Sequence, residues 1–367
     1  MVVSLVDDLH AAGLTGRGGA AFSTGVKVDA AHDHGAHLVV NACDGEIGAA
    51  KDAFVVEHHL EELLRGAHLV APGRRRTIRF AAHRGSRTAA LLTAAGLDVL
   101  DVPGRYVSSE ESALVSAAQG GLARPMTKRR PFVTGGRDAD GRRVPPTVVL
   151  NAETVWRVAQ VAEHGPTWFR SFGTEAEPGP RLVTLTGAVS WPGVLETQAG
   201  TPLAELLAAA EPARGAEHVV VGGLGGALVP LHRLRALRWS SDDLARVGAS
   251  LGPGILDLLD PQRCPVRTVA GYLRYAAGET AGQCGPCMFG VPALAGAWDR
   301  LLADPGPAAT HEVRRHAGLL PDRGACRFPD GVSRFAASAL QVLGPHLDAH
   351  AVGTCPTEGS LARAHHA

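Results

Sequence analysis

The sequence has few aromatic residues, no net charge and no long hydrophobic run, and the last two shortages each exclude a class of function. Phe, Trp and Tyr make up 5% of the 367 residues, while Lys+Arg and Asp+Glu number 36 each. A chain of zero formal charge lacks the basic surface of proteins that bind nucleic acid through bulk charge, and little in it attracts an anionic membrane. Because a run of about 18 apolar residues is lacking, we expect no membrane insertion.

Lysine is also scarce, which makes each lysine informative. Arginine outnumbers lysine 33 to 3, and the lysines are Lys27, Lys51 and Lys128. Near the N-terminus the chain carries acidic residues where a secretory signal would carry basic ones, so a cytoplasmic location is expected. In that compartment the six cysteines indicate metal ligands or buried thiols rather than disulfides.

Three segments with different patterns follow one another, in keeping with the two or three domains that the length suggests. Residues 1–173 alternate short β-type runs with helical stretches, which is typical of an α/β domain. Residues 174–239 show the strand-strand-helix-strand order of a small β-grasp module, and residues 240–367 predict a helical bundle. We expect strands at 37–41, 76–82, 97–102, 181–187, 193–197 and 218–223, and helices at 50–65, 203–210, 242–251, 266–278, 287–303, 308–318 and 332–350.

A glycine-rich segment near the N-terminus is the first candidate site. Gly16, Gly18 and Gly19 allow backbone N–H groups to approach phosphate oxygens, and Lys27 adds a positive charge close by. The spacing Gly16-x-Gly18-x-x-Ala21 matches a dinucleotide-binding fingerprint, but it follows no clear strand. A flexible glycine-rich loop is therefore the alternative.

Polar residues also follow two apolar strands and open one helix. Asn41 and Asn151 each end a β-type run, and ligands bind beyond the carboxyl ends of strands in open α/β sheets. An asparagine side chain offers both donors and an acceptor to the edge of a heterocycle, although a polar turn before a helix has the same appearance. Glu110 and Glu111 open a helix, where acidic residues often only complement the helix dipole.

A pair of cysteines with a third downstream is the remaining candidate. Cys284-Gly-Pro-Cys287 is a ligand turn of the kind found in iron–sulfur and zinc sites, and Cys326 supplies another thiol. A thioredoxin-type motif would need a preceding strand, and the residues before Cys284 are helical and glycine-rich instead. Inert thiols are the alternative to a metal or cluster site.

In this order and spacing, these pieces resemble the NADH-binding flavoprotein subunit of respiratory complex I. That family includes the diaphorase subunits of NAD-linked hydrogenases and formate dehydrogenases, and the likeness runs from about Gly13 to Pro356. The family pattern G-R-G-G-A-G-F-x-T-G-x-K is met by residues 16–27 with one change, at Ala21. Further pattern positions are met by Asn41, Ala42, Glu46, Gly48, Lys51, Asp52, Glu110, Glu111, Ala113, Pro146, Thr147, Asn151, Glu153 and Thr154.

The resemblance implies a fold, an activity and a set of contacts. The fold would be a Rossmann-like FMN-binding α/β domain, a β-grasp module of the soluble-ligand-binding (SLBB) type and a helical iron–sulfur-binding domain. The activity would be that of an NADH dehydrogenase, passing hydride from NADH to FMN and then single electrons through an iron–sulfur centre. The electrons would pass to a ferredoxin, an iron–sulfur partner subunit or a membrane-bound quinone reductase complex. The hydride transfer would need no protein side chain as an acid or base. The residues that would contact FMN are the loop Gly16, Arg17, Gly18 and Gly19, together with Asn41, Asp44, Glu110, Asn151 and Thr154. The residues that would contact NAD(H) are Phe22, Lys27, Glu46 and Glu111.

Three departures from the family pattern bear on these implications. Ala281 stands where the family has the first cluster cysteine, which leaves Cys284, Cys287 and Cys326 as metal ligands. A [4Fe–4S] cluster would then need another ligand for its last iron, and a [3Fe–4S] cluster or none is also open. Cys43 and Asp44 replace an aspartate and a glutamate, and Ser109 replaces a glycine.

These departures leave two other functions open. One is a non-catalytic assembly or binding member of the family with a degenerate redox site. The other is a zinc-containing binding protein that uses the three cysteines Cys284, Cys287 and Cys326 with a histidine.

Overall fold

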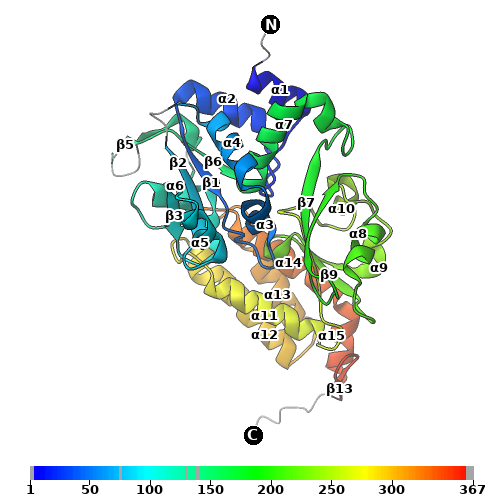
Figure 1. Cartoon of the computed structure of the whole chain (residues 1–367). Helices are drawn as coiled ribbons and strands as arrows, with labels where there is room; N and C mark the ends of the chain where they lie inside the picture. Colours follow the sequence, from blue (N-terminus) through cyan, green and yellow to red (C-terminus); the bar gives the residue numbers. More distant parts are fainter. Residues whose placement is uncertain (1–3, 74–76, 129, 138–140, 142, 361–367) are drawn as a thin grey trace. The chain divides into compact units, whose positions relative to one another are not determined.

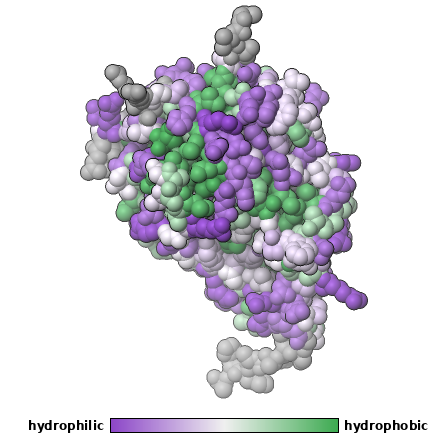
Figure 2. Space-filling model, in the orientation of Figure 1, coloured by the Kyte–Doolittle hydropathy of each residue, from purple (hydrophilic) through white to green (hydrophobic). Residues whose placement is uncertain are grey.

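The computed structural model describes residues 4–73, 77–128, 130–137, 141 and 143–360, so the outer ends of the first and third expected domains lie outside it (Figure 1). The chain divides into two compact units. The first contains the residues up to Thr184 with 194–201 and 252–254, and the second contains 185–193, 202–251 and the residues from 255 onward. Among the described residues, no helix is long and apolar enough to cross a membrane. Hydrophilic residues cover much of the face in Figure 2 and interrupt its hydrophobic areas.

A four-stranded parallel sheet forms the centre of the first unit. Its strands lie in the order β3-β2-β1-β6, and they are β1 (His37–Asn41), β2 (Ile78–His83), β3 (Val99–Val102) and β6 (Thr147–Asn151). This confirms the α/β expectation for the N-terminal part and the presence of strands within or close to the expected 37–41, 76–82 and 97–102, of which residue 76 lies outside the described residues. Because β1 and β6 are parallel and in register, Asn41 lies beside Asn151 at their carboxyl ends.

Helices cover both faces of this sheet. Leu38 and Val40 of β1 belong to one hydrophobic core and Val39 to another, as the alternation of side chains along a strand requires. Helix α6 packs against the second face, and the other helices of the unit contribute to the first. The helices are α1 (Leu5–Ala12), α2 (Thr24–His34), α3 (Lys51–His58), α4 (Leu60–Val70), α5 (Arg87–Ala94), α6 (Glu111–Ala118) and α7 (Ala152–Arg170), with short elements η1 (Tyr106–Ser109), η2 (Phe132–Thr134), β4 (Gly136–Arg137) and β5 (Arg143–Val144).

The single helix expected at 50–65 is two helices, α3 and α4. The break falls at His59, whose backbone leaves the helical region (φ −133°, ψ 30°). The His59 ring stacks on Trp156 with the ring centroids 4.0 Å apart. A contact with a residue far away in the sequence thus ends a helix that the local pattern would continue.

A second sheet has five strands in the order β10-β9-β11-β7-β8. They are β7 (Pro180–Gly187), β8 (Gly193–Gln198), β9 (His218–Val221), β10 (Ala227–Pro230) and β11 (Ile255–Leu258), with α8 (Leu203–Ala210) between β8 and β9 and η3 (Gly223–Gly225) before β10. Strand β11 falls in the segment expected to be wholly helical, and that expectation was wrong. All four residues of β11 are buried, so the strand shows no alternation in sequence.

The rest of the described chain is mostly helical, as expected, but it ends in a short two-stranded hairpin and two helices end earlier than expected. The elements are α9 (Leu231–Leu234), α10 (Ser241–Ala245), α11 (Pro265–Gly278), the π-helix η4 (Pro286–Gly290), α12 (Val291–Ala303), α13 (Pro307–Gly318), α14 (Phe328–Val342), α15 (Gly344–Ala351), β12 (Thr354–Cys355) and β13 (Gly359–Ser360). The helix expected at 242–251 stops before Gly248, whose φ is 71°. The helix expected at 332–350 divides at Leu343, because Pro345 has no N–H to continue it and suits the start of α15 instead.

Gly66 allows α4 and α7 to pack with their backbones in contact. A β-carbon at position 66 would lie 2.0 Å from the carbonyl oxygen of Val155. We expect Gly66→Ala to lower the free energy of unfolding by about 3 kcal/mol, since one helix must move away from the other. Urea unfolding followed by circular dichroism measures this change. The matched control is Gly271→Ala in α11, where an added β-carbon would meet no other atom. This substitution should be neutral or stabilising by up to about 1 kcal/mol. Equal effects of the two substitutions would contradict the packing argument.

Candidate functional site

The loop between α1 and α2 presents exposed backbone at its tip. Residues 18–22 are exposed, and the Phe22 side chain is 51% exposed although it is large and apolar. The base of the loop is closed by hydrogen bonds from the Gly16 N–H to the Phe22 carbonyl (2.8 Å) and from the Thr24 N–H to the Leu14 carbonyl (2.9 Å). A held loop with an exposed tip suits a ligand that contacts both backbone and an aromatic ring.

Arg17, which was expected to contact the cofactor, has its side chain engaged within the protein. Its buried guanidinium donates to the carbonyls of Pro178 (3.1 Å) and Pro180 (3.2 Å), and its backbone N–H donates to Oγ1 of Thr154 (2.8 Å). Burial, followed by the charge of Arg181, lowers the pKa of Arg17 to about 9. Arg17 and Thr154 therefore anchor the loop, while the glycines after Arg17 are exposed.

The glycine-rich loop meets the carboxyl ends of β1 and β6. A β-carbon at Gly18 would lie 3.4 Å from Cβ of Asn151, so the loop backbone lies within van der Waals distance of the end of β6. The Asn41 amide donates to the Ser109 carbonyl (2.9 Å), and its oxygen accepts from the Cys43 N–H (3.2 Å). The structure thus brings together three segments that were singled out separately in the sequence.

A buried ion network holds the Asn151 side chain. Lys51 is only 2% exposed and donates to the Asn151 oxygen (2.6 Å), while the Asn151 amide donates to Asp52 (2.8 and 3.0 Å). The Lys51 ammonium also pairs with Asp52 (3.1 Å) and Glu153 (3.2 Å). Burial alone would lower the pKa of Lys51, but the charges of Asp52, Glu153 and Asp44 outweigh it and raise the pKa above its ordinary value. Lys51 is therefore a fixed positive charge beneath the strand ends.

Asp44 uses its carboxylate within the protein, at the start of α3. It accepts from the backbone N–H groups of Asp52 (2.9 Å) and Ala53 (2.8 Å). Its φ of 47° is left-handed, a conformation that aspartate tolerates better than most residues. Burial, with the nearby charge of Asp52, raises the pKa of Asp44 to about 7. The neighbouring thiol of Cys43 is also buried, which raises its pKa.

The two acidic residues at the start of α6 have different roles. Glu110 caps the helix by accepting from the N–H groups of Ser112 (2.8 Å) and Ala113 (3.3 Å), and burial raises its pKa. Glu111 instead forms ion pairs with Lys27 (3.3 Å) and Lys128 (2.6 Å). Burial raises the pKa of Glu111, but the two lysines outweigh it and the net pKa is lowered.

All three lysines of the chain thus belong to this region. Lys27 and Lys128 meet on one carboxylate, and Lys51 holds the strand ends. Sequence reasoning had placed Lys27 and Lys51 on positions of the family pattern but not Lys128; its rarity was the available signal.

Glu46, expected at the NADH site, contacts a residue that sequence reasoning had not assigned to the site. One of its carboxylate oxygens accepts from the Tyr106 hydroxyl (2.5 Å) and the other from the Ile47 N–H (2.9 Å). Ser109 lies directly against Gly45, where an added β-carbon would overlap its hydroxyl, and donates to the Tyr106 carbonyl (2.9 Å). The serine that departs from the family pattern is therefore accommodated by a glycine opposite it.

The three expected metal ligands lie together in the second unit. Cys287 is buried in the π-helix η4, while Cys284 and Cys326 are half-buried, and all are free thiols. Burial, followed by the nearby thiols of Cys284 and Cys326, raises the pKa of Cys287 to about 11. The backbone N–H of Ala281 donates to Cys287, so position 281 also adjoins the group.

Comparisons with known proteins identify the family. Residues 9–160 match the model of the Nuo51 FMN-binding domain, and residues 267–350 match that of the NADH-ubiquinone oxidoreductase-F iron-sulfur binding region. The chain is 29% identical over 393 residues to the F subunit of the NADH-quinone oxidoreductase of Mycobacterium tuberculosis, covering 97% of this chain and 86% of that protein. Identity to the corresponding F 2 subunit of Rhizobium meliloti is 28% over 320 residues, covering 79% and 74%.

A solved structure agrees with these matches. The NAD+-reducing [NiFe]-hydrogenase in its H2-reduced state superposes with a TM-score of 0.78 at 26% identity, covering 97% of this chain and 63% of the hydrogenase chain. The class is therefore that of flavoproteins with an FMN-binding α/β domain and a helical iron–sulfur region. The chain belongs to the family of the NADH-quinone oxidoreductase F subunit, the 51 kDa flavoprotein, which confirms the resemblance seen in the sequence.

Ala21, the one departure within the glycine-rich pattern, has a left-handed backbone (φ 49°). We expect Ala21→Gly to raise the free energy of unfolding by roughly 0.5–1 kcal/mol, because relief of left-handed strain exceeds the added entropy of the unfolded chain. Ala20→Gly is the matched control, since Ala20 does not have a positive φ, and it should be destabilising. Urea unfolding of the FMN-free proteins distinguishes the two substitutions, and a change of the same sign in both would contradict the strain argument.

Proposed function

We propose that this chain is an FMN-dependent NADH:acceptor oxidoreductase, the electron-input module of a larger redox system. The observation that carries the proposal is the exposed glycine loop at the Asn41–Asn151 strand ends, within the segment that matches the FMN-binding family model. When bound, FMN would accept hydride from NADH and release the electrons singly.

The residues at the strand ends fit FMN. The exposed backbone of Gly18 and Gly19 offers N–H groups to a phosphate, and the side chains of Asn41 and Asn151 lie where a heterocycle would sit. Lys51 supplies a buried positive charge beneath Asn151. Glu110 and Thr154 border the site through the start of α6 and the anchor of the loop.

The second group of residues fits NADH. The exposed ring of Phe22 offers a stacking surface for a planar base. Lys27 and Glu111 form one ion pair, and Glu46 holds Tyr106, so the region presents both signs of charge. The chain's own residues bind and orient the two cofactors, and none is needed as an acid or base.

We propose an iron–sulfur centre on Cys284, Cys287 and Cys326. Their proximity and the match of residues 267–350 to the iron-sulfur binding region support it. With Ala281 in place of a fourth cysteine, the centre would be a [3Fe–4S] cluster or a [4Fe–4S] cluster with a non-cysteine ligand.

The five-stranded sheet supports assignment as a β-grasp module of the soluble-ligand-binding type. If β7 to β11 are numbered 1 to 5 along the chain, the strands lie in the sheet in the order 2-1-5-3-4, starting from β8. Helix α8 connects the second of these strands to the third. We propose domains at 1–173, 174–239 and 240–367, with β11 returning from the third segment to complete the second.

The names of the relatives suggest the physiological setting. They are NADH-quinone oxidoreductase subunits and an NAD+-reducing hydrogenase, and this chain spans about 63% of the hydrogenase chain it matches. We propose that the electrons leave to a ferredoxin or an iron–sulfur partner subunit, in the cytoplasm, as part of a complex that can include a membrane-bound reductase.

One observation favours a second candidate, a non-catalytic assembly member of the family. Ala281 removes one thiol ligand of the family pattern, which would weaken the route by which electrons leave. This candidate predicts a chain that keeps the fold but is not reduced by NADH.

The flavin spectrum tests the proposed function. Protein purified without oxygen and supplied with FMN should show a flavin spectrum that bleaches on addition of NADH. Phe22→Ala should raise KM for NADH about 3- to 10-fold with unchanged FMN content, because one stacking contact is lost. Trp191→Ala removes a more exposed aromatic ring elsewhere and should leave KM unchanged with an artificial acceptor. Bound FMN that NADH does not reduce would favour the non-catalytic candidate.

Restoring the missing thiol tests the cluster. We expect Ala281→Cys to increase the iron that survives exposure to air, towards about four per chain, because a fourth thiolate completes a cubane cluster. Iron and sulfide analysis with electron paramagnetic resonance measures this change. Ala303→Cys adds a thiol at an exposed site at the end of α12 and should have no effect. The same gain in both variants would point to adventitious iron.

A further inference from the structure

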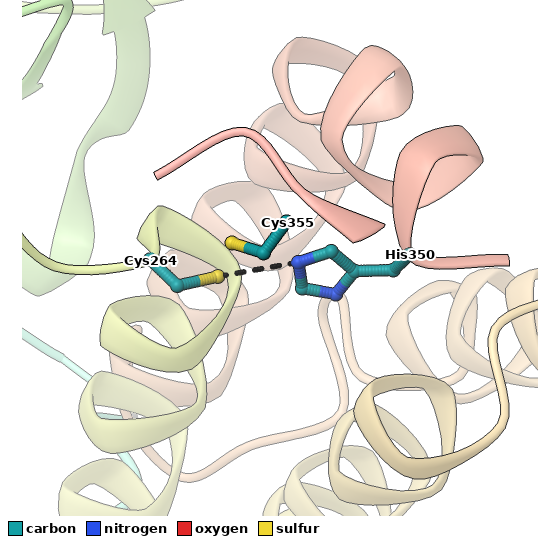
Figure 3. A group of neighbouring side chains, drawn as sticks. All are labelled: Cys264, His350 and Cys355. Atoms are coloured by element: carbon teal, nitrogen blue, oxygen red, sulfur yellow. Dashed lines mark hydrogen bonds between the residues drawn. The ribbon is translucent and has the colours of Figure 1, made fainter. Parts of the chain in front are cut away.

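Two cysteines and a histidine outside the proposed cluster site form a second group of metal-ligating side chains. Cys264, His350 and Cys355 point toward one another (Figure 3), and one ligand atom from each lies within 4.8 Å of the others. None of them belongs to the cysteine set assigned to the iron–sulfur centre.

The three side chains come from separate elements of the second unit. Cys264 immediately precedes α11, His350 lies in the last turn of α15, and Cys355 ends the short strand β12. The first two are 86 residues apart in the chain. The backbone N–H of Cys264 also donates to Glu358 (3.1 Å), so a further contact ties the C-terminal hairpin to the start of α11.

The surroundings of the group favour a bound ion over a simple polar contact. Cys264 is fully buried, and Cys355 and His350 are 3% and 4% exposed. Nε2 of His350 contacts the Cys264 sulfur at 3.5 Å, and Nδ1 of the same ring is buried without a hydrogen-bond partner among the described residues. Nε2, the ring nitrogen that faces the Cys264 sulfur, has only this weak contact, and a metal ion bound to it would be a stronger partner.

The chemistry and spacing of the ligands select the ion. Two thiolates and an imidazole are the ligand types of zinc, with bonds of about 2.3 Å and 2.0–2.1 Å, so ligand atoms around one tetrahedral ion lie about 3.5–4 Å apart. Small side-chain movements bring the observed group to that spacing. A cubane cluster would require more thiolates and a wider arrangement than this group provides.

We propose that Cys264, His350 and Cys355 bind one Zn²⁺ ion as a structural site separate from the iron–sulfur centre. Binding converts both thiols to thiolates and releases two protons, with no change of oxidation state. No fourth side chain among the described residues joins the group. The ion joins the start of α11, the helix that leads toward Cys284, to the C-terminal hairpin.

Metal analysis of the full chain, purified from cells supplied with zinc and iron, tests the proposal. The intact protein should contain about one zinc per chain in addition to its iron. Cys355→Ser and His350→Gln should lower the zinc affinity by about tenfold or more with the iron content unchanged. Cys284→Ser is the matched control, since it removes a thiol from the other group, and it should lower iron and leave zinc in place.

Cobalt provides a readout that does not depend on activity or on the flavin. Co²⁺ added to the zinc-depleted protein should give the visible and near-ultraviolet bands of a thiolate-bound tetrahedral ion, and Cys355→Ser should abolish them. In the unsubstituted protein, tryptic cleavage near the C-terminus should be faster after zinc is removed than before. This comparison reports the structural effect of the ion without the need for a substituted variant that folds.

Three results would overturn the proposal. The first is a protein without zinc whose Cys264 and Cys355 are joined as a disulfide. The second is zinc that is lost in Cys284→Ser and kept in Cys355→Ser, which would place the ion in the cluster site. The third is zinc that both substitutions leave in place, which would make it an adventitious surface ion.

Discussion

The buried ammonium of Lys51 is the interaction on which the candidate cofactor site depends. It lies between α3, where Lys51 and Asp52 stand, and the junction of β6 with α7, where Asn151 and Glu153 stand. Removing a lysine from water is costly, and here two carboxylates and an amide oxygen compensate for it. One cation thereby fixes the orientation of the Asn151 amide and the ends of three elements. A redox cofactor requires such a rigid edge of the sheet in order to be held in one orientation.

The loop above this edge combines a held base with an exposed tip. The Arg17 guanidinium and the Thr154 hydroxyl fix the base, and Gly18 lies beside Asn151. The strained backbone of Ala21 shows why the family pattern has glycine at that position: only glycine adopts positive φ without cost. Departures from a family pattern are therefore not equivalent. Ser109 is accommodated by Gly45 opposite it, Ala21 carries strain, and Ala281 removes a ligand.

The two cysteine groups of the second unit differ in the way their ligands are arranged. Cys284, Cys287 and Cys326 include two half-buried thiols, and Cys287 lies in a π-helix, which suits a cluster that exchanges electrons with a partner. Cys264, His350 and Cys355 are all buried and close together, which suits a single ion with a structural role. Helix α11 begins at one group and leads toward the other, so the site that we propose for zinc would steady the element before the cluster cysteines.

The sequence by itself determined the parts of this protein that depend on local pattern. The strands of the first sheet, the glycine-rich loop and the ordered spacing of the motifs were enough to identify the family, because periodicity and motif spacing are local properties. The tertiary structure alone decided where β11 lies, why a helix breaks at His59, and that Lys128 shares Glu111 with Lys27. It also decided that Cys264 meets His350, 86 residues away. Such contacts depend on how distant segments pack, and no local pattern of residues encodes them.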